Sequence, residues 1–124
     1  MIKVKHLMDA VEPDDGARFW VEPIGLTRDL RQWCSVGATL PQVAPPSQLT
    51  KWFDRHPEAY DVFRGCYHDH LAASGLRPGL HELARAGVSH NFTLLHQGDD
   101  PEHNTATALQ EFLSELDAWC SPES

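Results

Sequence analysis

The stretch LLHQGDDPEHN, residues 94–104, decides which fold this chain is expected to adopt. The apolar run from Phe92 to Leu95 predicts a buried strand. Asp100 followed by Pro101 is typical of a helix N-cap with proline at the first helical position, so a helix is expected from Pro101 to about Trp119. A strand that leads directly into a helix favours an α/β domain, in which ligands bind at the carboxyl ends of the strands.

Two more strands are expected near the N-terminus. Ile2, Val4, His6 and Met8 alternate with their neighbours at the period of a half-buried strand, and residues 17–21 form a second apolar run. We therefore predict a single small α/β domain with a mostly parallel short sheet covered by helices. The turn at residues 14–16 leaves an α+β fold with an N-terminal hairpin as the alternative.

Helices are predicted from capping residues and from apolar positions that recur every three or four residues. Short helices are expected at residues 29–34 and 48–53, a longer helix ends at Gly75, and another short helix ends at Gly87. The last helix should bury one stripe of side chains, with Phe112 and Trp119 at its margins. The buried stripe comprises Ala106, Leu109, Leu113, Leu116 and Cys120, and the longer helix should bury Tyr60, Phe63, Tyr67 and Leu71.

Length and charge exclude several classes of protein. The 124 residues fit one domain, expected over residues 1–120 with a frayed end at residues 121–124. The 10 basic and 18 acidic residues give a formal net charge of −8, so nucleic acid is not expected as a partner, because phosphate binding depends on Lys and Arg. No basic amphipathic stretch and no apolar run of about 18 residues is present, so no membrane contact is expected. The oligomeric state is not specified.

The cysteines indicate a reducing compartment. Cys34, Cys66 and Cys120 are odd in number and widely spaced, without a Cys-x-x-Cys pair. Neither a disulfide scaffold nor a zinc knuckle is therefore predicted, and a cytoplasmic location is expected. Cys66 is expected to be a small buried hydrophobic residue, and a nucleophilic role for Cys34 is not favoured.

Several short strings, in the same order along the chain, resemble the YeaO-like branch of domain-of-unknown-function family 488. The most specific are VEPDDG at residues 11–16, KWF at residues 51–53 and EHN at residues 102–104. The resemblance covers nearly the whole chain. It implies a compact α/β fold and a cytosolic, bacterial-type protein, and it supplies no established activity.

The chain also departs from that family at two places. Members carry a Leu-Trp-Pro-Arg-Gly string after the second strand, where this chain has IGLTRDL at residues 24–30, so either Arg28 or Thr27 stands at the arginine position. After the central strand, a tyrosine and a Lys-Asp pair are replaced by His96, Asp99 and Asp100. The comparison implies a divergent member whose ligand differs.

The strand-to-helix junction holds the main candidate site. Arg28, His96, Asp99, His103 and Asn104 are the predicted ligand-binding residues, with Arg28 clamping an anionic group and Asn104 donating hydrogen bonds. His96 and His103 are the candidate catalytic bases. The spacing matches no recognised metal motif, so no metal is expected; were one bound, His96, Asp99 and His103 would be its ligands. No cofactor is indicated.

A second group of carboxylates lies in the loop between the first two strands. Asp9, Glu12, Asp14 and Asp15 form either a solvated acidic turn or a general acid and base pair that faces the His96 loop across one crevice. The string YHDH at residues 67–70 resembles a ligand cluster, but its histidines are two residues apart on a helix and point about 160° from each other. A solvated helix face is therefore favoured for them.

Three classes of function remain open on these residues. The favoured one is a module that binds a small polar or anionic ligand at the strand-to-helix junction. The alternatives are a histidine-based, possibly metal-assisted enzyme, and a non-catalytic interaction protein that exposes Trp20, Trp33 or Trp52 to a partner. The fold alone does not choose among them.

Overall fold

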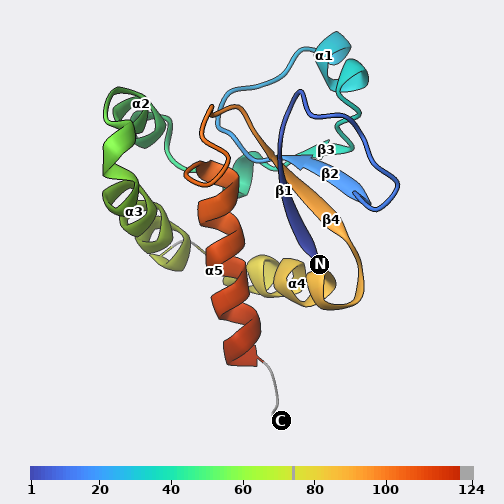
Figure 1. The fold of residues 1–124 in the computed structure, drawn as a ribbon. Coiled ribbons are helices and arrows are strands. Elements are labelled where there is room, and N and C mark those ends of the chain that lie inside the picture. Colours follow the sequence, from blue (N-terminus) through green and yellow to red (C-terminus); the bar gives the residue numbers. More distant parts are fainter. Residues whose placement is uncertain (74, 121–124) are drawn as a thin grey trace.

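A computed structural model describes residues 1–73 and 75–120, with the side chains of residues 117–120 left aside. Its centre is a sheet of four strands, β1 (Ile2–His6), β2 (Ala17–Trp20), β3 (Ala38–Thr39) and β4 (Phe92–His96), in the order β1-β4-β2-β3. All described strand pairs are parallel. The predicted α/β class is therefore confirmed, and the hairpin alternative is wrong because β4 lies between β1 and β2 (Figure 1).

The helices agree with the predicted ones in number and differ at their ends. They are α1 (Arg28–Trp33), α2 (Ser47–Arg55), α3 (Tyr60–Ala73), α4 (Arg77–Ser89) and α5 (Thr105–Cys120), with 3-10 turns at Pro41–Val43 and Pro57–Ala59. α4 continues two residues past Gly87, and α5 begins at Thr105 instead of Pro101. None of the described helices is long and apolar enough to span a membrane.

One face of the sheet carries the main hydrophobic core. Phe92 and Leu94 of β4 lie in register with Ile2 and Val4 of β1, and all four pack with α2, α3, α4 and α5. Figure 1 shows α5 standing beside the strands, with α2 and α3 on the side of α5 away from them. The predicted stripe on α5 is buried from Ala106 to Leu116, whereas the predicted Cys120 and Trp119 fall outside the described side chains.

The opposite face of the sheet is half apolar and half ionic. Towards the carboxyl ends of the strands, Leu95 and Trp20 pack with Cys34 and Leu30 near α1. Towards the amino ends, Lys3 and Arg18 flank Thr93 in register across the sheet. The loop of residues 9–16 covers these cations, so this crossover has no helix.

Asp15 is the centre of that ionic half. Its side chain is 1% exposed and accepts hydrogen bonds from Nζ of Lys3 at 2.8 Å, Nζ of Lys5 at 3.1 Å and Nη1 of Arg18 at 2.8 Å. Burial alone would raise the pKa of Asp15, but the hydrogen bonds from these three cations outweigh burial and hold the pKa well below its usual range. Asp15 is therefore a permanent anion that holds the loop on the sheet.

Candidate functional site

A hollow of about 460 Å³ opens at the carboxyl ends of β2 and β4. Its walls come from residues 22–24 after β2, from α2, and from the loop of residues 97–105 that joins β4 to α5. β4 continues into α5 on one face of the sheet, whereas β2 continues into α1 on the other face (Figure 1). The hollow thus lies where neighbouring strands connect in opposite directions, which is where open parallel sheets bind ligands.

Glu22 is the buried charged residue of this hollow. It is 7% exposed, its Oε2 accepts a hydrogen bond from the backbone N–H of Gln97 at 3.2 Å, and Thr105 also hydrogen-bonds to its side chain. Burial raises the pKa of Glu22, the nearby Asp54 adds to the rise, and the two hydrogen bonds oppose it. No Lys, Arg or His side chain lies within 4 Å of this carboxylate among the described ion pairs.

The loop that leads into α5 is built by two side chains that bind backbone groups. Asp100 accepts hydrogen bonds from the N–H groups of Glu102 and His103 at 2.9 and 3.2 Å. Asn104 accepts one from the N–H of Thr107 at 2.8 Å and donates one to the carbonyl of Asp100 at 2.9 Å. The predicted N-cap at Asp100 is therefore wrong, because its carboxylate closes a separate turn. The N-cap of α5 is Asn104, four residues later.

His103 lies on the wall of the hollow in a fixed orientation. Its Nδ1 lies 3.0 Å from Oδ2 of Asp100, and its ring centre lies 4.7 Å from the ring centre of Tyr60. The hydrogen bonds from the N–H of Glu102 and from His103 lower the pKa of Asp100. With Nδ1 occupied by Asp100, Nε2 is the ring nitrogen available to a ligand.

His96 does not share this wall. It is 2% exposed, and its ring packs edge to face against His6 with the centres 5.5 Å apart. Burial and the neighbouring His6 lower the pKa of His96 to about 4, so its ring is neutral near pH 7. The structure therefore separates His96 from Asp99, His103 and Asn104, which line the hollow.

Arg28 lies elsewhere as well. It is exposed at the start of α1 and lines a different, shallow hollow with Arg31 and Gln32. The preceding Thr27 accepts a hydrogen bond from the N–H of Leu30 at 3.2 Å and so caps the helix. Of the five residues predicted to bind the ligand, the structure brings together Asp99, His103 and Asn104.

The acidic loop faces the ion cluster and not the hollow. Oδ2 of Asp9 accepts a hydrogen bond from the backbone N–H of His6 at 2.9 Å, while Glu12 and Asp14 pair with Lys5 and Lys3 at 2.9 Å. Glu12, Asp14 and Asp15 are the one group of described residues whose ligand atoms are close enough to hold a metal ion. Lys3, Lys5 and Arg18 already pair with these three carboxylates, so we assign them a structural role.

Three smaller predictions have mixed outcomes. Trp20 is 2% exposed, so its predicted place on a partner surface is wrong, whereas Trp33 is 81% exposed. His68 is not on a solvated face, because its Nε2 lies 2.7 Å from the carbonyl oxygen of Ala108 on α5 and its ring contacts that helix. Cys66 is exposed instead of buried.

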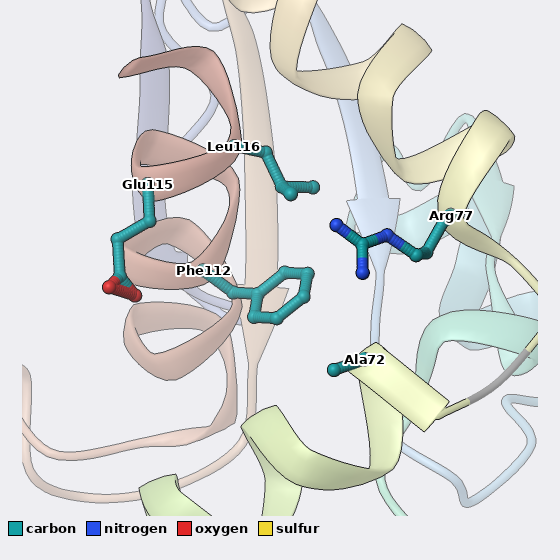
Figure 2. A pocket seen from close by; sticks show the side chains of 5 residues that line it. All are labelled: Ala72, Arg77, Phe112, Glu115 and Leu116. Carbon is teal, nitrogen blue, oxygen red and sulfur yellow. The ribbon is translucent and has the colours of Figure 1, made fainter. Parts of the chain in front are cut away.

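A second hollow, of about 320 Å³, lies between α3, α4 and α5. Figure 2 shows the guanidinium of Arg77 pointing towards Phe112 and Leu116, while the carboxylate of Glu115 points away from it. Among the side chains drawn there, the cation of Arg77 is the one polar group directed inward. We regard this hollow as a packing defect at the surface of the helical layer.

Glu22, Lys51 and Asp54 line the first hollow and were not among the predicted site residues. A signal for Glu22 was present, because it follows the run of residues 17–21 as Gln97 follows β4. Parallel strands end at the same edge of a sheet, so residues that follow two such strands come together. The contribution of α2 depends on tertiary packing and has no local signal.

Comparisons with known proteins identify the family. The sequence model described as "Inactive DUF488-N3 subclade" matches residues 1–120. Uncharacterised proteins of Mycobacterium bovis and Mycobacterium tuberculosis are 30% identical over 90 residues, which cover 70% of this chain and 74% of each relative. No solved structure matches the chain. The resemblance to domain-of-unknown-function family 488 is thereby confirmed, and the chain belongs to the inactive DUF488-N3 subclade.

Proposed function

We propose that this protein binds a small polar molecule without transforming it, in the hollow at the carboxyl ends of β2 and β4. One observation carries the proposal: the buried carboxylate of Glu22 lines an open hollow at the point where the connections of β2 and β4 diverge. A volume of about 460 Å³ is within the range of small-molecule sites. Asp99, His103 and Asn104 supply further polar groups from the neighbouring loop.

The absence of catalysis in this proposal rests on two points. The subclade to which the chain belongs is described as inactive. In addition, the neutral His96, which we predicted as one of two catalytic bases, does not line the hollow in the described structure. A binding protein needs complementary polar groups at a fixed site, and the hydrogen bonds of Asp100 and Asn104 hold the loop in place.

A histidine-based enzyme is the second candidate, and one contact favours it. Asp100 holds Nδ1 of His103 at 3.0 Å, which is the arrangement that orients a general base. A substrate bound in the hollow and converted at a rate that His103→Ala abolishes would favour this candidate. A ligand recovered unchanged after prolonged incubation with the protein would favour simple binding.

Nuclear magnetic resonance tests the proposal directly. The backbone amide signals of Gln97, Gly98 and Thr105 should shift in a saturable way when one compound of a panel of small polar metabolites is added. The amide signals of Gln32 and Val36 near Arg28 report on the separate shallow hollow and serve as the internal control. A panel of cationic, neutral and anionic compounds that moves none of the hollow's amides would contradict the proposal.

The cellular setting is part of the same proposal. We place the protein in the cytoplasm, without nucleic acid or membrane partners, on the basis of its unpaired cysteine pattern and its net charge of −8. Fractionation of cells that express the tagged protein measures the location. Recovery in the membrane fraction would contradict it.

A further inference from the structure

We infer that the hollow selects an organic cation, namely a small molecule with a guanidinium or ammonium group that docks on the carboxylate of Glu22. The inference rests on the proposed binding function and names the ligand's chemical class. It departs from the anionic ligand that the family arginine would suit, because Arg28 stands apart from the hollow.

Glu22 has unused hydrogen-bonding capacity. An ionised carboxylate offers about four acceptor positions, and the described donors to Glu22 are the N–H of Gln97 and the side chain of Thr105. The residue is 7% exposed and lines the hollow. A buried carboxylate without a cationic partner is costly, and a ligand cation relieves that cost.

The residues that line the hollow carry more negative than positive charge. Asp54 of α2 lines the hollow and is close enough to disfavour ionisation of Glu22, and Asp99 lines it from the loop. Lys51 is the single Lys or Arg among the lining residues, and the described ion pairs do not join it to Asp54. An anionic ligand would meet four carboxylates, those of Glu22, Asp54, Asp99 and Asp100, and one ammonium group, whereas a cation is attracted by the sum of these charges.

A carboxylate that lines a small hollow suits the geometry of a guanidinium group. Guanidinium groups pair with carboxylates through two parallel hydrogen bonds, and such charge-assisted bonds are about twice as strong as neutral ones. Thr50 and Ser47 on α2 and Asn104 on the loop provide neutral polar groups for the rest of the molecule. The apolar part of the wall, Phe53 and Ile24, accommodates a short alkyl chain.

Three matched probes separate charge from shape: butylguanidinium, its neutral isostere butylurea, and pentanoate, an anion of similar chain length. Each is titrated into the protein at pH 7 while the amide signals of Gln97 and Thr105 are followed. We expect saturable shifts with butylguanidinium, at least about tenfold weaker binding of butylurea, and the weakest binding with pentanoate.

Variants assign the effect to the named carboxylates. Glu22→Gln keeps the acceptor oxygen and the shape, and should weaken butylguanidinium about tenfold or more. Asp54→Asn, at an exposed position on α2, should weaken it by a smaller factor and carries little folding risk. Glu102→Gln is the matched control, because Glu102 lies in the same loop but does not line the hollow, and it should leave binding unchanged.

The outcomes separate this inference from the binding function. Butylguanidinium binding that depends on Glu22 and not on Glu102 supports both. If butylurea, pentanoate or another polar compound binds the hollow as tightly as the cation, or if Glu22→Gln leaves cation binding unchanged, the inference is overturned and the binding function stands. If no compound of any charge moves the hollow's amide signals, both are overturned.

Discussion

Replacement of Asp15 by asparagine tests whether the ion cluster beneath the loop of residues 9–16 stabilises the fold. The side chain of Asp15 is 1% exposed and lies 2.8–3.1 Å from the charged nitrogens of Lys3, Lys5 and Arg18. Asparagine has nearly the same shape but no charge. Lys3 and Lys5 would then keep the exposed carboxylates of the loop as their only described counterions, and Arg18 would have none among the described ion pairs.

The size of the effect follows from the burial of Asp15. Removing one partner of a buried ion pair costs about 3–5 kcal/mol. The cost here should be about 2–3 kcal/mol, because the asparagine oxygen still accepts a hydrogen bond and Glu12 and Asp14 remain beside the lysines. An unfolding entropy of about 2.1 cal/mol/K per residue converts this into a fall in Tm of about 8–12 °C for a chain of this length.

Thermal unfolding followed by circular dichroism at several pH values measures both the loss and its cause. The three cations hold the pKa of Asp15 below its usual range, so its contribution to stability is present above about pH 4 and is lost as the pH falls below that value. Asp15→Asn has no such contribution to lose. The difference in Tm between the wild type and the variant should therefore shrink on acidification.

Asp14→Asn is the matched control for the same loop. Its carboxylate also lies 2.9 Å from Nζ of Lys3, but its side chain is 64% exposed, so the Tm should stay within about 2 °C of the wild type. Equal losses in the two variants, or an Asp15→Asn variant as stable as the wild type, would refute the reasoning that burial of Asp15 makes the cluster structural.

Three further changes have defined outcomes. Asn104→Ala removes the side chain that caps α5 and should lower the free energy of unfolding in urea by about 1–2 kcal/mol. Gly16→Ala should lower the Tm far more than Gly25→Ala, because Gly16 has φ +63° and its Cβ would lie 1.9 Å from the carbonyl oxygen of Asn91, whereas Gly25 has open space. Glu22→Gln should raise the Tm of the ligand-free protein at pH 7, and this gain should vanish as the pH falls through the raised pKa of Glu22.

In the sheet, the positions of the strands depend on neighbouring residues, whereas the order of the strands depends on residues far apart in the sequence. The alternating residues of β1 and the apolar run of β4 determine where those strands lie, and the sequence predicted both. The insertion of β4 between β1 and β2 could not be predicted, because it depends on pairing between residues about 75–90 positions apart along the chain.

The sequence predicted a site at the junction after β4, and the structure has a hollow there that is lined by a partly different set of residues. The rule that parallel strands end at a common edge located the junction after β4, and Asp99, His103 and Asn104 do line the hollow there. The burial of His96 follows from its place in β4, a central strand in which every residue is buried. The position of Arg28 depends on the path of residues 22–27, for which no periodicity exists.

The two faces of the sheet explain why unsatisfied charge is concentrated in one hollow. On the ionic face, each carboxylate from Glu12 to Asp15 has a lysine or arginine partner, so that loop has little affinity left for a ligand. At the hollow, Glu22 is buried without a cation among the described residues, which lowers the stability of the ligand-free protein. Structural requirements explain the first arrangement and not the second. A stability cost at a fixed, accessible site is typical of binding residues. Glu22→Gln should therefore raise the stability of the ligand-free protein and at the same time weaken cation binding.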